Sequence, residues 1–334
     1  MRLFRNKFQD QSKSFHKMFW TALFLFNVGA CILLFFFLRA KKDYSVNQKE
    51  HCHFIGASYM TMNNEFYKII SEEINARVEA EGDKLMLRDP ALDASRQNRQ
   101  ILDMLAMGID ALIVTPVEWE SLTDTLRQAK ERGVLTIVVD TKVQGGDLAD
   151  CTITSDNYGA GRLVGEYFAK KHNKAKLLIM THESAKSGQD RVRGFLDAIA
   201  GKEGIRIVKK IECKGQLEIA MPKLLETIDD GVEFDNIFCL NDLASVGVVA
   251  ALDENDQAGR VGVYGVDASP DAKALIKEGI MEASAAQFPS EIGKEAADAV
   301  YRLFAKKNVE KDILIPVELI TQENVEKFGA DRWQ

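Results

Sequence analysis

The sequence predicts an α/β protein with parallel sheets that helices cover on both faces. From about residue 52 onward, short apolar runs alternate with segments whose apolar residues recur at helical spacing. The apolar runs are continuous, which is typical of strands buried on both faces. Right-handed crossovers between such strands make a sheet doubly wound. The alternation occurs twice in similar order and length, so we expect two similar lobes, each with its own sheet.

The first set of elements follows a short tether. Its first helix shows the helical spacing clearly, with apolar side chains at Phe66, Ile70 and Ile74. The next two helices end near Gly108 and at Gly133, and glycine is the residue that commonly follows a helix. The predicted strands are HFIGASY, KLMLRD, ALIVTP and LTIVVD, and the predicted helices cover residues 64–81, 95–107 and 121–131.

The second set begins with CTITSDN. Its predicted strands are KLLIMTH, RIVKKIEC, NIFCLND and VGVYGVD, and its predicted helices cover residues 158–172, 191–200, 220–228 and 244–254. A further helix begins near Ser269-Pro270, and a short apolar run then ends at Gln287. Neither a Pro-rich nor a Ser-rich linker separates the two sets. We therefore expect closely packed lobes joined by short crossings.

A long apolar stretch precedes the α/β region. Met18 to Leu38 contains 21 residues without a charge, enough to cross the roughly 30 Å hydrocarbon core as a helix. Basic residues outnumber acids on its N-terminal side, which favours a cytoplasmic tail at residues 1–17. The prediction is a single-pass anchor in the cell membrane at 18–38, a tether at 39–51, and the remainder outside the cytoplasm.

A cleaved lipoprotein signal is the alternative to a retained anchor. Val28-Gly29-Ala30-Cys31 resembles a bacterial lipoprotein cleavage box. However, the apolar run continues past Cys31 as far as Leu38, which a lipid-modified cysteine at a mature N-terminus does not need. The run is also longer than the roughly 7–15 apolar residues of a signal peptide. The retained anchor is the favoured interpretation.

Composition and motifs argue against several classes of function. The net charge of −7 and the lack of a helix-turn-helix argue against nucleic-acid binding. The five cysteines have no ligand spacing, and His51 and His53 lack a third partner, so no metal is expected. Gly159, Gly161 and Gly165 have GxGxxxG spacing without the acid of a dinucleotide site, and we expect them to pack a helix on a sheet. Without a Walker loop or a nucleophile motif, neither a cofactor nor an enzymatic activity is predicted.

Polar residues recur where the predicted strands end. They are Asn63-Asn64, Asp140, Asn241-Asp242 and Asp267. In open α/β sheets, ligands bind outside the carboxyl ends of the strands. Carboxylates and amides hydrogen-bond to hydroxyl groups, and Arg191 would supply several donors in one plane. These strand ends therefore favour a polyhydroxylated ligand, with the aromatic rings of Phe66 and Tyr67 covering its C–H face.

Two of these strand-end acids have a second interpretation. Asp267 lies two residues before Ser269 and is also suited to capping the helix that begins there. For Asp242 we expect the more modest role of starting the next helix, so that its substitution costs little binding.

From about Cys52 to its end, the chain resembles the type I periplasmic sugar-binding proteins of ABC transporters, the ribose and galactose group. The matching landmarks are MTMNNEFY, IDALIVTPVE, IVVDT, TITSDNYGAGRLVGEY, DRVRGF, IFCLND, VYGVDASPDA and ASAAQFPSEIG. The resemblance implies two α/β lobes joined by three hinge crossings, with one sugar in the cleft. By landmark position, the N-terminal lobe covers 52–154 and 288–315, and the C-terminal lobe covers 155–287 and 316–334. The implied ligand contacts are Asn64, Phe66, Tyr67, Asp140, Arg191, Asn241, Asp267 and Gln287.

The chain departs from the ribose-binding members at three places. Met60 stands where they have serine, Thr141 where they have arginine, and residues 215–216 lack their aromatic side chain. These differences argue against ribose itself, and leave the cleft unaffected. The same fold serves as the effector domain of lac-repressor-type regulators, but this chain has no DNA-reading headpiece.

The predicted function is that of a membrane-anchored, non-enzymatic sugar-binding protein with a monomeric ectodomain outside the cytoplasm. In the first hypothesis it delivers a monosaccharide to an ABC permease by hinge closure. In the second it is a sensor whose closed form signals to a membrane histidine kinase, which the retained anchor favours. An enzyme acting on sugars is a distant third hypothesis, because no pair of carboxylates at glycosidase spacing is identified.

Overall fold

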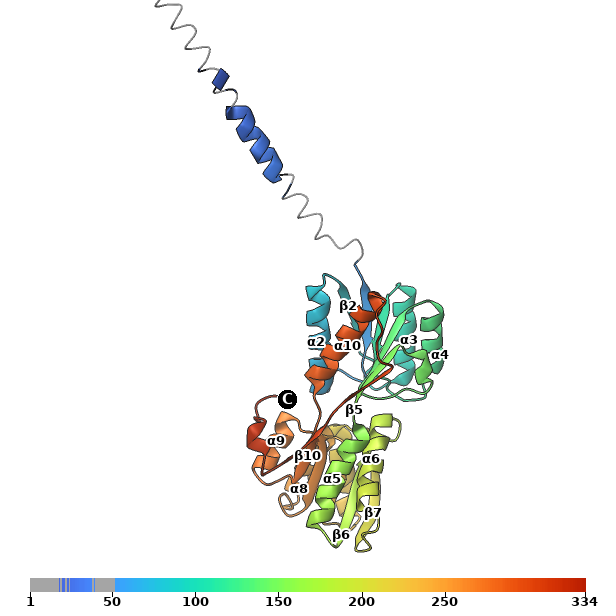
Figure 1. Cartoon of the computed structure of the whole chain (residues 1–334). Coiled ribbons are helices and arrows are strands. Elements are labelled where there is room, and N and C mark those ends of the chain that lie inside the picture. The colour runs from blue at the N-terminus through green and yellow to red at the C-terminus, as the bar shows by residue number, and fades with distance from the viewer. Residues whose placement is uncertain (1–17, 19, 22, 24, 38, 40–51) are drawn as a thin grey trace, which may run out of the picture. The chain divides into compact units, whose positions relative to one another are not determined.

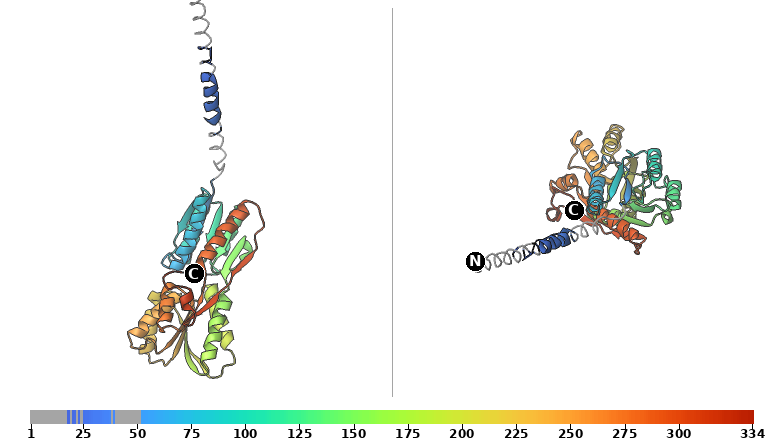
Figure 2. Two further views of the ribbon diagram at one scale, coloured as in Figure 1. Left: turned by 60° about the vertical axis from the view of Figure 1, so that its left-hand side comes forward. Right: turned by 90° about the horizontal axis from the view of Figure 1, so that it is seen from above.

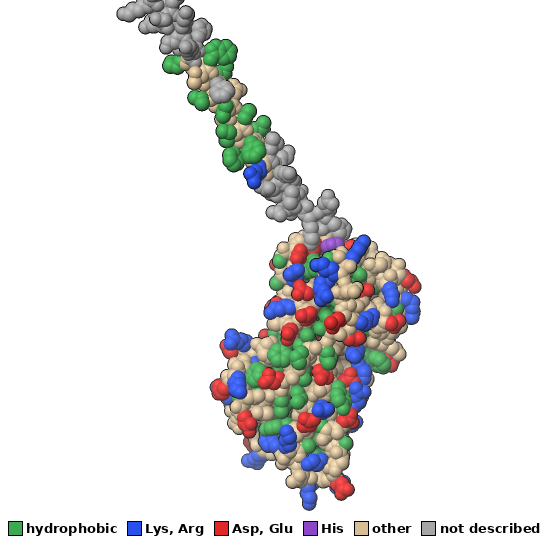
Figure 3. Space-filling model, viewed as in Figure 1, with side chains coloured by type: hydrophobic (Ala, Val, Ile, Leu, Met, Phe, Trp, Pro, Cys, Tyr) green, Lys and Arg blue, Asp and Glu red, His purple; other side chains and the backbone are tan. Residues whose placement is uncertain are grey.

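The computed structural model describes residues 18, 20, 21, 23, 25–37, 39 and 52–334. The chain divides into two units, Met1–Cys52 and His53–Gln334. In the first unit, residues 25–37 are helical and most of their apolar side chains are exposed (Figure 3). Among the described residues, no helix combines the length and apolar character that a membrane span requires. The predicted tail at 1–17, most of the tether (40–51) and positions 19, 22, 24 and 38 of the predicted anchor lie outside the described residues.

The second unit contains two six-stranded sheets (Figure 1). The first has the strand order β11-β5-β4-β3-β1-β2, and all of its strand pairs are parallel. Its strands are β1 (Phe54–Ser58), β2 (Lys84–Arg88), β3 (Ala111–Val114), β4 (Leu135–Val139), β5 (Cys151–Ser155) and β11 (Asp312–Ile315).

The second sheet has the order β12-β10-β9-β8-β6-β7. Its strands are β6 (Ala175–Thr181), β7 (Ile205–Glu212), β8 (Asn236–Cys239), β9 (Gly262–Asp267), β10 (Ala283–Ala286) and β12 (Glu318–Thr321). Two α/β lobes with parallel sheets confirm the predicted fold class. The expectation of parallel pairing fails only at the edge, where β12 runs antiparallel to β10. The reason is that β12 continues directly from β11 of the other sheet without an intervening helix.

Helices cover both faces of each sheet (Figure 2). The helices are α2 (Glu65–Ala80), α3 (Ala94–Ala106), α4 (Thr123–Glu131), α5 (Asn157–Lys171), α6 (Lys186–Ile199), α7 (Leu217–Asp229), α8 (Asp242–Asp253), α9 (Pro270–Lys277) and α10 (Pro289–Phe304), with the short 3₁₀ turns η1 (Gly146–Leu148) and η2 (Val325–Lys327). On the first sheet, Ile113 faces the core beneath α2 and α10, and Leu112 faces the core beneath α3 and α4. Burial on both faces explains why the strand sequences are continuously apolar.

The start of α6 differs from the prediction. This helix begins at Lys186, five residues before the expected start at Arg191. Gly188 lies in the first turn of the helix. A Cβ there would come within 2.7 Å of the His182 carbonyl oxygen. The glycine therefore permits a close approach of the helix to the preceding strand.

Gly161 and Gly165 of α5 pack against another helix, so for these two the expectation of packing on a sheet was wrong. Gly159 lies against the side chain of Asp156, which caps its own helix. A Cβ at Gly161 would lie 1.9 Å from the Arg191 carbonyl oxygen, and one at Gly165 would lie 2.7 Å from that of Phe195. On the α6 side, Gly194 similarly approaches the Tyr158 carbonyl. Helices α5 and α6 thus meet backbone to backbone, which fixes the height and rotation of α6 beside its sheet.

Candidate binding site

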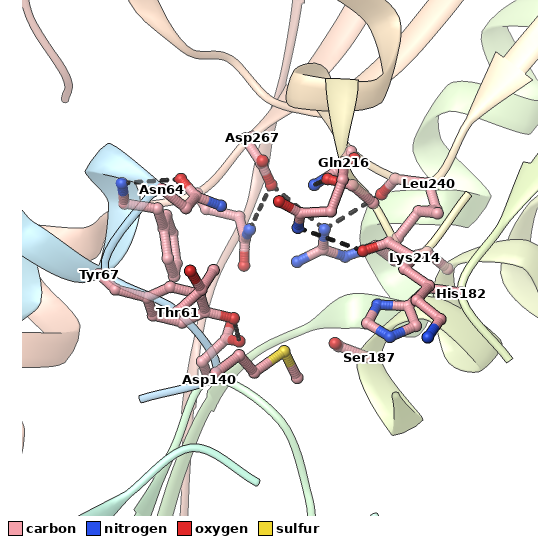
Figure 4. A pocket seen from close by; sticks show the side chains of 16 residues that line it. Thr61, Asn64, Tyr67, Asp140, His182, Ser187, Lys214, Gln216, Leu240 and Asp267 are labelled. Atoms are coloured by element: carbon pink, nitrogen blue, oxygen red, sulfur yellow. Dashed lines mark hydrogen bonds and ion pairs between the residues drawn. The ribbon is translucent and has the colours of Figure 1, made fainter. Parts of the chain in front are cut away.

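One pocket lies where the carboxyl ends of the strands of the two sheets face each other (Figure 4). All eight residues expected to contact the ligand line this pocket: Asn64, Phe66, Tyr67, Asp140, Arg191, Asn241, Asp267 and Gln287. They come from the ends of β4, β8, β9 and β10 and from the starts of α2 and α6. Parallel strands bring these ends together because all of them point the same way.

Asp267 is not a helix cap. The side chain of Ser269 caps α9 by accepting a hydrogen bond from the Ala272 N–H. Asp267 is 5% exposed, and its carboxylate instead faces the pocket (Figure 4). Its Oδ1 accepts hydrogen bonds from Arg191 Nη1 at 3.2 Å and from Gln287 Nε2 at 2.6 Å. Asp267 therefore lines the pocket and leaves the capping of α9 to Ser269.

Arg191 is held rigidly at the centre of the site. It is 4% exposed and lies in the second turn of α6, instead of opening that helix as expected. Its Nε donates to Asn157 Oδ1 at 2.7 Å, and its Nη1 donates to the Leu240 carbonyl at 3.1 Å as well as to Asp267. Within the described residues, Nη2 makes no hydrogen bond. One edge of a fixed guanidinium is thus available to a ligand.

Asp140 supplies a second buried acid from the first sheet. Its carboxylate accepts a hydrogen bond from the Tyr67 hydroxyl at 3.0 Å. Burial raises the pKa of Asp140 to about 6, against the opposing effects of the Arg191 charge and the Tyr67 hydrogen bond. Burial likewise raises the pKa of Asp267, and Arg191 again opposes the shift. The positive charge of Arg191 therefore opposes the effect of burial on the pKa of both acids.

Both acids stand on strained backbone at the strand ends. The φ angles are +69° at Asp140, +126° at Asp267 and +52° at Ala268. Side chains other than glycine rarely adopt these values, which cost of order 1–3 kcal/mol each and persist only where the surroundings enforce them. Strain of this kind is concentrated at ligand sites.

The surroundings that enforce the turn at Asp267 centre on Asp242. This side chain is fully buried and accepts hydrogen bonds from Ser269 N and Ser284 Oγ, both at 2.8 Å. Ser284 Oγ in turn accepts from Ala268 N at 3.0 Å. The expectation that Asp242 only starts α8 was wrong, because the cap is Asn241, whose side chain accepts from the backbone N–H of Ala244. Asp242 supports the turn that presents Asp267.

The pocket offers a mixture of unpaired donors and acceptors. Gln287 is 1% exposed, and its Oε1 has no hydrogen-bond partner among the described residues. Because Nε2 of this amide is committed to Asp267, Oε1 requires a donor from the ligand. Arg191 Nη2 requires an acceptor. Vicinal hydroxyl groups meet both needs, since each hydroxyl donates once and accepts as well.

Eight further residues line the pocket and are not among the eight predicted contacts: Met60, Thr61, His182, Ser187, Lys214, Gly215, Gln216 and Leu240. Of these, Met60, Gly215 and Gln216 stand at positions where the resemblance implies altered contacts. His182 follows β6 directly, so the rule that identified Asp140 also applies to it. Burial lowers the pKa of His182 to about 4, which keeps its ring neutral at neutral pH. Lys214 and Gln216 lie in a loop without a periodic signal. Across the described part of the chain, no cluster of three metal-ligating side chains is present.

Hydrogen bonds join the two lobes around the pocket, among them one from Asn157 Nδ2 to the Asp140 carbonyl at 3.3 Å. Asn63 Nδ2 donates to Glu218 Oε1 at 2.9 Å. The Trp119 N–H donates to the Ser184 carbonyl at 2.9 Å. The Ser187 N–H donates to Thr141 Oγ1 at 2.8 Å, so Thr141, one of the three departures from the ribose-binding proteins, bonds to the other lobe. The described lobes are therefore in contact across the cleft.

The raised pKa of Asp140 predicts how the free energy of unfolding depends on pH. The folded protein keeps this proton up to about pH 6, whereas the unfolded chain loses it near pH 4. The contribution of the protonated acid is therefore fully present below about pH 4 and is lost as the pH rises to about 6. Asp140→Asn removes this titration and keeps the acceptor for Tyr67. We expect the free energy of unfolding of wild type, relative to the variant, to fall between pH 4 and 6 in denaturant titrations. Parallel pH profiles would contradict the assignment.

Comparisons with known proteins agree with this geometry. A model described as periplasmic binding protein domain matches residues 55–308. Over 284 residues the chain is 26% identical to the ribose import binding protein RbsB of Bacillus subtilis, and the match covers 85% of this chain and 92% of that protein. Over 276 residues it is 26% identical to the D-ribose/D-allose-binding protein of Pseudomonas aeruginosa, covering 78% and 86%.

A solved structure gives the same result. An ABC transporter solute binding protein from Bacillus halodurans with bound myo-inositol has a TM-score of 0.79 at 25% identity, covering 85% of this chain and 99% of that chain. These matches confirm the family resemblance noted in the sequence, and the relatives are binding proteins. The chain is accordingly a non-enzymatic binding protein and belongs to the periplasmic binding protein domain family.

Proposed function

We propose that this protein binds a neutral monosaccharide or cyclitol outside the cytoplasm and delivers it to an ABC permease. The observation that carries the proposal is the buried group formed by Arg191, Asp267 and Gln287. Among the described residues, Arg191 Nη2 has no acceptor and the amide oxygen of Gln287 has no donor. Adjacent hydroxyls of a polyol satisfy both atoms at once.

The lining of the pocket favours a ligand with hydroxyls on both faces. Phe66 and Tyr67 offer apolar surface from α2. The opposite loop contributes the amide of Gln216, at a place where the family resemblance implies an aromatic side chain in ribose-binding proteins. Myo-inositol, which is bound in the Bacillus halodurans structure, carries a hydroxyl on every ring carbon. We therefore expect cyclitols and hexoses to bind more tightly than ribose.

Ligand release requires the lobes to separate. We place the hinge at the three crossings near residues 154–155, 287 and 315–316, where the chain passes between the two sheets. Periplasmic binding proteins are an established example of hinge closure around a ligand. In this proposal the hydrogen bonds of Asn63, Trp119 and Thr141 across the cleft form on closure.

A ligand screen tests the proposed function. The full-length protein is heated with myo-inositol and its isomers, pentoses, hexoses and linear polyols. A ligand that binds only the folded state raises the melting temperature. We expect at least one neutral polyol to do so, and small-angle scattering to show compaction on saturation. If no polyol shifts melting, polyol binding is wrong; if one does without compaction, the hinge is wrong.

The role of Asp267 is tested with the ligand so identified. We expect Asp267→Ala to lower the affinity at least about 30-fold, roughly 2 kcal/mol, with the fold retained. Asp242→Ala should instead lower the melting temperature strongly, because it leaves the Ser269 N–H and the Ser284 hydroxyl without their buried acceptor. Calorimetric titrations and melting curves of both variants separate the two roles. Normal binding by Asp267→Ala would contradict the proposed site.

We also propose that Met18 to Leu38 anchors the protein in the membrane, with the binding unit outside. The support is the uninterrupted apolar sequence beyond Cys31. Mass spectrometry of the protein from native membranes should recover peptides N-terminal to Cys31. A mature N-terminus at diacylated Cys31 would identify a lipoprotein instead.

A retained anchor also supports a second candidate, a sensor that signals to a membrane histidine kinase. Transport needs only loose tethering, whereas a sensor is held beside its partner. Co-purification of the ligand-bound protein with a kinase in place of a permease would favour the sensor.

A further inference from the structure

The segment that follows η2, residues 328–334, returns to the binding site. It leaves the second lobe after β12 and ends between the two lobes, where the C label stands in Figure 1. Two of its side chains, Trp333 and Gln334, are half-buried. Neither of them is among the residues that line the pocket.

Gln334 joins two of the strand ends that form the site. Its Nε2 donates to the carbonyl oxygen of Asp267 at 2.9 Å and to that of Gln287 at 2.6 Å. These strand ends are neighbours, because Gln287 N also donates to the Asp267 carbonyl. The Gln334 amide therefore fixes the backbone of two pocket residues whose side chains are bonded to each other.

Trp333 contacts the other lobe. Its ring lies edge-on to Phe66 of α2, with centroids 5.7 Å apart and an interplanar angle of 62°. It packs against the core beneath α2 and α10 of the first sheet. Trp333 thus contacts an aromatic residue of the pocket on one lobe, and the next residue, Gln334, bonds to two strand ends on the other lobe.

Lys273 of α9 forms hydrogen bonds with this segment. Its side chain is fully buried, and Nζ donates to the Arg332 carbonyl at 2.6 Å and to Gln334 Oε1 at 3.0 Å. A buried ammonium group is costly unless its hydrogen bonds are satisfied. The segment supplies two acceptors for this ammonium group, and these hydrogen bonds hold the segment in place.

We propose that residues 328–334 form a strap that fastens the two lobes together and positions Asp267 and Gln287 for the ligand. The effect on ligand release rests on the proposed function, whereas the fastening of the lobes does not. Because the strap adds contacts between the lobes only while they are together, it slows opening. Loss of the strap therefore raises the rate of ligand dissociation.

The first experiment needs no ligand. The chain has three tryptophans, so Trp20→Phe and Trp119→Phe leave Trp333 as the reporter in the full-length protein. We expect Trp333 fluorescence to resist quenching by acrylamide in this background and to become readily quenched when Lys273→Met is added. Arg332→Ala is the matched control, since it removes an exposed side chain and keeps the carbonyl. Equal quenching with and without Lys273 would overturn the strap.

The second experiment uses the polyol identified by the screen. Stopped-flow measurements should show dissociation about tenfold faster for Trp333→Ala and at least about threefold faster for Gln334→Ala, with Arg332→Ala unchanged. Melting curves show whether each variant is folded. Wild-type dissociation rates in both folded variants would overturn the positioning role. If wild type binds no polyol, the proposed function fails, and the quenching result still decides whether the strap exists.

Discussion

The buried interaction between Arg191 and Asp267 is the constraint on which the site depends. Each residue is at most 5% exposed, and removal of Arg191 leaves the buried Asp267 carboxylate without its opposite charge. The guanidinium is fixed by Asn157 and the Leu240 carbonyl as well, so it cannot follow a moving partner. The close packing of Gly161 on the backbone of Arg191 brings α6 to the depth at which this arrangement forms. The buried contact between α5 and α6 thus determines where Arg191 lies in the pocket.

The remainder of the site is organised to hold the two acids in place. Asp140 and Asp267 both lie on backbone with positive φ, so the sheets alone do not fix their carboxylates. Asp242 and Ser284 hold the turn after β9 from within the lobe, and Gln334 holds its carbonyl from the other side. Preorganisation of this kind reduces the entropy that a ligand must overcome on binding.

Much of this arrangement was predictable from the sequence, because it follows from strand direction. Continuous apolar strands imply parallel sheets, and parallel sheets gather their strand-end residues at one edge. The same strand-end rule applied to Gln287, which ends a short apolar run, and the family resemblance added the three hinge crossings. His182 was predictable by the strand-end rule but was not singled out as a ligand residue.

Other features have no local signal. The early start of α6 depends on the close approach of Gly188 to the His182 carbonyl, which is a tertiary contact. The burial of Asp242 depends on partners 27 and 42 residues away, so the sequence suggested only a helix start. The contacts of Trp333 and Gln334 join the last residues of the sequence to α2 and to two strands, and no periodicity reports such a contact.

A crystal structure of the protein with the polyol that gives the largest thermal shift tests polyol binding most directly. We expect ligand hydroxyls within hydrogen-bond distance of Arg191 Nη2, Gln287 Oε1 and the Asp140 carboxylate, with the Arg191–Asp267 pair intact. A ligand bound outside this pocket, or one that leaves Arg191 Nη2 and Gln287 Oε1 to water, would contradict the proposed mode of recognition.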